Sequence, residues 1–82
     1  MKPWFVFIDP TLVSWIAKQP QNVFTDYVNA IEGIREIAKV FSKHSIVSCG
    51  SGFLIYVENQ NTVLECAIFQ DKKEIHVVRI IY

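Results

Sequence analysis

The residues best suited to chemistry in this 82-residue chain lie close together near its end. Lys72 and Lys73 are adjacent, and His76 and Arg79 follow shortly after them. Imidazole titrates near neutral pH and can transfer protons, whereas lysine and arginine can stabilise the charge that develops on a phosphate during RNA cleavage. Lys73, His76 and Arg79 therefore form a candidate ribonuclease site.

A second interpretation of His76 does not involve catalysis. A general base acts on a nucleophile, and the sequence places no serine or cysteine beside His76, although Glu65 or Glu74 could orient its ring. We therefore favour a strand histidine that faces solvent or packs on its ring edge.

The same cations could instead belong to a protein-binding surface. Lys72 and Lys73 lie at a predicted hairpin tip, where lysines commonly protect strand edges from aggregation. Arg79 interrupts an apolar strand, so it either points outward at an edge or makes an ionic contact with a partner. Large aromatic side chains pack in cores by default and mark interface hot spots when they are exposed. The predicted partner-binding residues are Lys72, Lys73, Arg79, Tyr82 and Trp15.

The other candidate motifs predict no site. Gly50-Ser51-Gly52 is not a phosphate loop, because such loops lead into a helix N-terminus and the residues that follow here are strand-like. Cys49 and Cys66 form no Cys-x-x-Cys pair, and together with His44 and His76 they lack zinc-ligand spacing. We expect both cysteines to be small buried side chains, and we expect neither a metal nor a cofactor.

Composition indicates one small domain with surplus apolar surface. Hydrophobic residues make up 51% of the chain and charged residues 20%, against about 45–50% and about 25% in typical globular domains. A small domain leaves much of its surface exposed, so part of this surplus should form an interface with a protein partner or a second copy. Eight basic and eight acidic residues balance, which disfavours nucleic acid as the partner.

No targeting segment is apparent in the chain. The apolar run Trp4–Ile8 is stopped by Asp9-Pro10 after five residues. Such a run is too short for a signal-peptide core or a membrane span. We therefore expect a cytoplasmic protein without membrane contact.

The first half of the chain predicts one strand and two helices. Nearly every position of Lys2–Ile8 is apolar, which is typical of a strand buried on both faces or central in a sheet. Asp9-Pro10 is a typical N-cap and first helical residue, and Pro20 ends this short helix. A longer helix begins at Asn22 or its neighbour, and Gly33 within it predicts a close approach to the sheet. Its apolar stripe has helical spacing: Val23, Tyr27, Ala30, Ile34, Ile37 and Phe41.

The second half, Ser45–Tyr82, predicts three antiparallel strands. Glu58–Asn61 and Gln70–Glu74 are polar breaks of hairpin length. Phe53–Val57 is continuously apolar, which is typical of a central strand. Alternate residues of the next strand share one face: Val63, Glu65, Ala67 and Phe69. We expect one α+β domain over residues 1–82, with the helices packed on one face of the sheet and a first strand that can pair in parallel across the helical crossover.

This order of elements resembles that of the RelE/ParE superfamily of bacterial type II toxins. The local match comprises Gly52–Val57, the polar turn, Val63–Phe69 and the basic hairpin, and Phe5–Ile16 is similar to the family's first strand and helix. The resemblance implies a strand–helix–helix–three-strand fold. It also implies either ribosome-dependent mRNA cleavage or capture of a target enzyme, as gyrase-directed members do.

The residues at the family's catalytic positions differ from the ribonuclease pattern. Leu54 stands where the family has an arginine, and Ser45 and Val47 fall near the family's lysines. Lys73 alone keeps its charge, and Arg79 falls near the late family tyrosine. The resemblance therefore favours a toxin, inhibitor or immunity-type protein that binds and inhibits a partner, which would be an antitoxin, a target enzyme or a second copy. A ribosome-associated mRNA endoribonuclease is the alternative.

Overall fold

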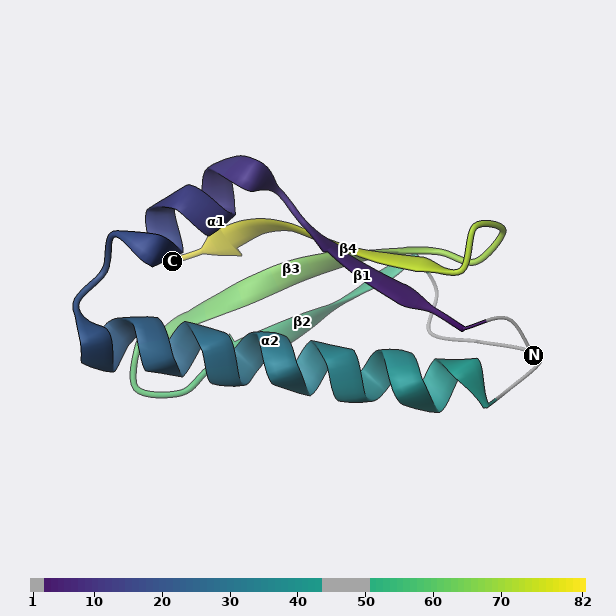
Figure 1. Ribbon diagram of the computed structural model, residues 1–82, viewed down its shortest axis with the longest axis horizontal. Helices are drawn as coiled ribbons and strands as arrows, with labels where there is room; N and C mark the ends of the chain where they lie inside the picture. Colours follow the sequence, from purple (N-terminus) through teal and green to yellow (C-terminus); the bar gives the residue numbers. More distant parts are fainter. Residues whose placement is uncertain (1–2, 44–50) are drawn as a thin grey trace.

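The computed structural model of the chain describes residues 3–43 and 51–82. The predictions for His44, Ser45, Val47, Cys49 and Gly50 lie outside these residues. The elements follow in the order β1 (Phe5–Ile8), α1 (Pro10–Ala17), α2 (Gln21–Ser42), β2 (Gly52–Val57), β3 (Thr62–Phe69) and β4 (Glu74–Ile81) (Figure 1). The chain is thus an α+β domain with two helices and one four-stranded mixed sheet. Neither helix in the described part is long and apolar enough to cross a membrane.

The strands lie in the order β1-β4-β3-β2. β2 and β4 each pair antiparallel with β3, whereas β1 pairs parallel with β4, with Phe5 opposite Glu74. The parallel pair is possible because α1 and α2 carry the chain back across the sheet. The predicted three-stranded block therefore describes only part of the sheet.

β1 and β2 are the edge strands of the sheet, so two predictions were wrong. The apolar run Lys2–Ile8 is not a central strand, and neither is Phe53–Val57. Phe5 and Phe7 in β1 are exposed, whereas Val6 and Ile8, which alternate with them, are half-buried. The physical reason is that α2 covers one face of the sheet, so that apolar residues pointing to the other face stay in contact with solvent.

Local signals determine where the helices begin. Asp9 Oδ1 accepts a hydrogen bond from the Thr11 N–H at 2.9 Å, and Pro10 is the first residue of α1, as predicted. α2 begins directly after Pro20. The predicted apolar stripe of α2 faces the core, with Tyr27, Ala30, Ile34 and Phe41 buried and Val23 and Ile37 half-buried.

The close approach expected at Gly33 occurs elsewhere. Gly33 is exposed, and no atom lies within 4 Å of the position that a Cβ would take there. Gly52 at the start of β2 makes the close approach instead, because a Cβ there would overlap the carbonyl oxygen of Cys66 on β3. The prediction for Gly33 was wrong because a glycine in a helix does not by itself indicate which side of the helix is covered.

Hydrogen bonds at both ends fix α2 on the sheet. Near its start, Tyr27 Oη lies 2.9 Å from Thr62 Oγ1, and both residues are buried. At its end, the Trp4 N–H donates to Ser42 Oγ at 2.9 Å. The side chains buried most completely between α2 and the sheet are Tyr27, Ile34, Leu64, Ile75, Val57, Val77 and Cys66.

Candidate protein-binding site

The face of the sheet that points away from α2, here called the outer face, is mostly apolar. Because side chains alternate along a strand, the strand register assigns residues of all four strands to it. Five large apolar side chains on this face are between 40% and 61% exposed: Phe5, Phe7, Leu54, Tyr56 and Phe69. Val63, Ala67 and Ile81 on the same face are half-buried.

The exposed apolar area of the outer face is comparable to the largest apolar patch of a typical monomeric protein. A large apolar side chain contributes roughly 150–250 Å² when fully exposed, so five that are about half exposed leave on the order of 500 Å². The largest apolar patch on a monomeric protein is typically about 300–600 Å² and is often functional. The outer face is therefore a candidate interface in its own right.

Arg79 lies on the outer face and is paired within the chain. Its Nε donates to Glu65 Oε2 at 2.6 Å and its Nη2 to Glu65 Oε1 at 3.3 Å. The hydrogen bond and the negative charge of Glu65 raise the pKa of Arg79. Arg79 was predicted either to point outward at an edge or to make an ionic contact with a partner. The structure shows that it points outward from the central strand β4, and that its ionic contact is with Glu65 of the same chain.

A β-bulge determines which face Arg79 occupies. Glu65 is opposite Arg79 and Cys66 is opposite Val77, so Val78 is an extra residue in β4. Val77 is buried on the face of the sheet opposite the outer face, and simple alternation would point Arg79 to that same side. The extra residue turns Arg79 to the outer face, where it meets Glu65.

His76 packs between two aromatic rings of the outer face. Its ring stacks on Phe7 at a centroid distance of 5.1 Å and meets Phe69 edge-on at 4.8 Å. Its Nε2 lies 2.9 Å from Glu74 Oε1, so Glu74 orients the ring. The thiol of Cys66 is buried on the opposite face of the sheet, and burial together with the charge of Glu65 raises its pKa to about 12. The packing interpretation of His76 fits this geometry better than the catalytic one.

The structure does not gather the candidate ribonuclease residues into one cluster. Lys73 lies in the β3–β4 turn with a φ of 58°, and its Nζ is 5.6 Å from the centroid of the Trp4 ring. Lys73 and Arg79 are six positions apart along an extended chain, which corresponds to roughly 20 Å. Lys73, His76 and Arg79 each contact a partner within the chain, and they are spread along β4.

Three of the five predicted partner-binding residues do come together. Trp15, Arg79 and Tyr82 line a cavity of about 400 Å³ between α1 and the end of β4. Trp15 also packs edge-on against the ring of Tyr27 at 5.4 Å, so it is half-buried. Lys72 and Lys73 lie at the opposite end of β4, in the turn before Glu74.

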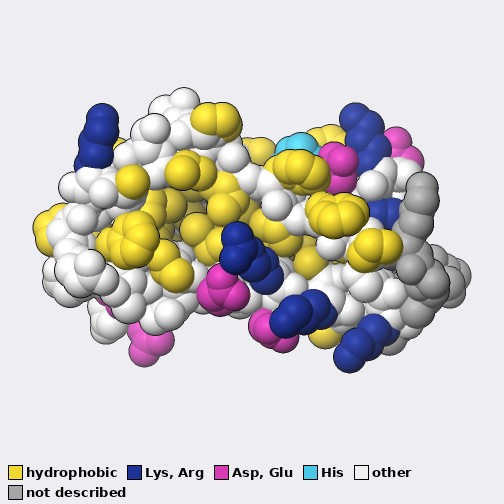
Figure 2. All heavy atoms as spheres, viewed as in Figure 1, with side chains coloured by type: hydrophobic (Ala, Val, Ile, Leu, Met, Phe, Trp, Pro, Cys, Tyr) yellow, Lys and Arg dark blue, Asp and Glu magenta, His cyan; other side chains and the backbone are white. Residues whose placement is uncertain are grey.

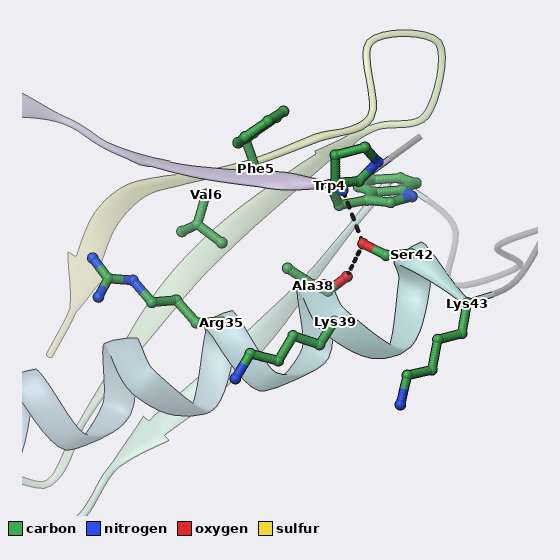
Figure 3. A pocket seen from close by; sticks show the side chains of 9 residues that line it. Trp4, Phe5, Val6, Arg35, Ala38, Lys39, Ser42 and Lys43 are labelled. Carbon is green, nitrogen blue, oxygen red and sulfur yellow. Dashed lines mark hydrogen bonds between the residues drawn. The ribbon is translucent and has the colours of Figure 1, made fainter. Parts of the chain in front are cut away.

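A second groove, here called the edge groove, lies between β1 and the last turns of α2. Figure 3 shows the residues around this cavity of about 610 Å³. Its lining residues are Pro3, Trp4, Phe5, Val6, Arg35, Ala38, Lys39, Ser42 and Lys43. Figure 2 shows the same side of the molecule, with charged side chains along α2 and apolar side chains gathered between α2 and α1.

Sequence reasoning missed both surfaces, although each had a signal. The outer face was indicated by Phe5 and Phe7 at alternate positions of β1, which were interpreted as buried. The edge groove was indicated by Arg35, Lys39 and Lys43, which repeat every fourth residue along α2 and therefore share one side of the helix.

The geometry of the described residues thus offers an apolar face and a groove with a basic rim, and it disperses the residues proposed for catalysis. The RelE/ParE resemblance rests on the sequence pattern and the order of elements alone. No family model matches the chain, and no curated protein and no solved structure matches it either.

Proposed function

We propose that this domain binds a target protein through its outer face and thereby inhibits it. The observation that carries the proposal is the outer face itself, where large exposed apolar side chains surround one ion pair that is already formed. The centres of protein interfaces are poor in charged residues and rich in aromatic ones. The target should therefore present an apolar patch of similar size.

The charge distribution on the outer face favours a protein target over nucleic acid. Phosphate binding requires cations that are available to the phosphate. Glu65 already neutralises Arg79, and Leu54 is exposed on this face where the RelE/ParE ribonucleases have an arginine. Target capture by gyrase-directed members of that family is the closer functional parallel, and a small inhibitor or immunity-type protein would use the same surface.

A pair of matched variants tests this proposal. Leu54→Asp with Tyr56→Asp places two charges on the outer face, whereas Val13→Asp with Val40→Asp places two at exposed helix positions away from it. Growth arrest on expression, and a stoichiometric complex with the purified target, should be lost in the first variant and kept in the second. Circular dichroism should show that both variants remain folded. Equal effects of the two variants would contradict the proposal, as would a homodimer in light scattering that the outer-face variant alone disrupts.

The ribonuclease alternative predicts a different result. Primer extension on a translated message would then show cleavage linked to codons, and the cleavage would disappear in Lys73→Ala and Arg79→Ala. That outcome would refute a function that consists of binding alone. Growth arrest without cleavage, together with a stoichiometric complex, would refute the ribonuclease.

A further inference from the structure

One edge of β1 has no strand beside it in the part of the chain that the structure describes. On its other side, Phe5 N–H donates to the Lys73 carbonyl at 3.0 Å and Asp9 N–H donates to the Val77 carbonyl at 3.1 Å. Because alternate residues of a strand direct their backbone groups to opposite sides, the N–H groups of Val6 and Ile8 point away from β4. Such an edge is a template for an added strand.

The edge groove lies directly beside this free edge. Figure 3 shows Val6 directed toward α2 and Phe5 directed away from it, with Ala38 across the groove from Val6. At one end, Ser42 Oγ accepts the Trp4 N–H and donates to the Ala38 carbonyl at 2.8 Å. This pair occupies the Trp4 N–H, so backbone pairing with an added strand begins at Val6.

The rim of the edge groove on α2 is basic. Arg35 and Lys39 form ion pairs with Glu32 and Glu36, and all four side chains are more than half exposed. Ion pairs that are this exposed contribute little, so an incoming carboxylate can replace the glutamates. Lys43, one turn further on, makes no ion pair among the residues that the structure describes.

The spacing of this basic row matches that of an extended chain. Residues four apart on a helix are about 6 Å apart along its axis. Alternate residues of a strand are about 6.6 Å apart, and they point to the same side. A strand beside β1 would direct every second side chain to the side of the sheet that α2 covers, where Arg35, Lys39 and Lys43 line the groove, and the others to the side of Phe5 and Phe7.

We infer that the edge groove binds an extended segment of another protein in which acidic and apolar residues alternate, and that the segment joins the sheet as a fifth strand next to β1. Its backbone pairs with Val6 and Ile8. The methylene groups of its glutamates pack on Val6 and Ala38, and the carboxylates of these glutamates point to Arg35, Lys39 and Lys43. Its apolar residues extend the outer face. Main-chain pairing supplies affinity and the alternating side chains supply specificity.

The probe for this site is a capped seven-residue peptide of alternating glutamate and valine, labelled for fluorescence anisotropy. Lys39→Glu should weaken its binding roughly tenfold, because one attraction becomes a repulsion. Lys18→Glu is the matched control, since Lys18 is also exposed but is the C-cap residue of α1, away from the edge groove. The affinity of the Lys18→Glu variant for the peptide should change by less than about twofold. An equal loss in both variants would overturn the inference, because it would show attraction by overall charge.

Two further measurements test strand addition itself. Two peptides are N-methylated at alternate amides, one at the amides that would pair with β1 and the other at the amides that point away from it. The first peptide should not bind, and the second should bind as the unmethylated peptide does. Solvent exchange of the Val6 and Ile8 amides should slow when the peptide binds. Three outcomes would each overturn the inference. They are equal binding of both methylated peptides, no binding at about 1 mM peptide, and displacement of the peptide by a uridine oligonucleotide whose own binding depends on Lys39. Binding should persist in Leu54→Asp with Tyr56→Asp, which separates this site from the outer-face proposal.

Discussion

The hydroxyl pair between Tyr27 and Thr62 permits a sharp test of how α2 is held on the sheet. Tyr27 is 1% exposed and Thr62 is 7% exposed, and their oxygens lie 2.9 Å apart. Tyr27→Phe keeps the ring that packs against Trp15 and removes only the hydroxyl. Thr62→Val removes the other hydroxyl at nearly constant volume.

Each single variant leaves one buried hydroxyl without a partner. An unsatisfied buried polar group costs about 1–3 kcal/mol, so each variant should lower the free energy of unfolding by about 2 kcal/mol. In a domain of this size, 1 kcal/mol corresponds to about 4–8 °C in Tm, so Tm should fall by roughly 10 °C. The double variant removes both groups and should lose much less than the sum, with a coupling of about 1–2 kcal/mol.

Urea denaturation of the four proteins measures this cycle, provided that the m-value stays constant. The wild type and the three variants should differ in the midpoint of unfolding alone. A Tyr27→Phe variant within about 0.5 kcal/mol of the wild type would refute the reasoning, because surface changes alone produce effects of that size. Strictly additive single effects would refute it too, since the two groups would then not interact.

The two glycines of the described helix and sheet should respond oppositely to alanine, and the buried thiol should be unreactive. Gly33→Ala should raise the free energy of unfolding by about 0.5–1 kcal/mol, because glycine is a poor helix former and the new methyl group meets no atom. Gly52→Ala should lower it by about 1–3 kcal/mol, because the methyl group would overlap the Cys66 carbonyl; the same sign for both in urea denaturation would contradict this contrast. In a Cys49→Ser background, Cys66 should resist iodoacetamide at pH 8.5 until urea is added, and alkylation of the folded protein would show that the thiol is accessible. Folding raises the pKa of this thiol from 9.0 to about 12. Between these pH values the folded state binds more protons than the unfolded state, so the free energy of unfolding should fall as pH rises through that window. The fall should be smaller in Cys66→Ala.

The sequence predicted those parts of the fold that depend on neighbouring residues. Asp9 and Pro10 at the start of α1, and the apolar stripe of α2, follow from capping and periodicity, which act within a few turns. The edge positions of β1 and β2 could not be predicted in this way. An apolar run shows that both faces are apolar, but it does not show whether a helix of the same chain covers the second face.

The candidate site was predicted less well, for geometric reasons. Lys73, His76 and Arg79 are close in sequence, but an extended strand spreads them out and the turn holds Lys73 apart. The bulge at Val78 determines to which face Arg79 points. The sequence does not reveal this bulge, because both faces of the strand are largely apolar and one extra residue does not visibly change its hydrophobic pattern. The apolar surplus in the composition was the more informative signal, because it predicted exposed apolar surface before any residue could be assigned to it.

The pairing of β1 with β4 has a consequence for how the chain folds. Phe5 and Glu74 lie opposite each other although 69 positions (74 minus 5) separate them in the sequence. Contacts between such distant positions slow folding, because a long loop must close before they form. During synthesis β1 emerges before every other strand, yet its only neighbour in the described sheet is made after all of them. A nascent chain that has not yet reached β4 should therefore display β1 as an unpaired apolar segment, and we expect chaperone binding and aggregation to be concentrated in that interval.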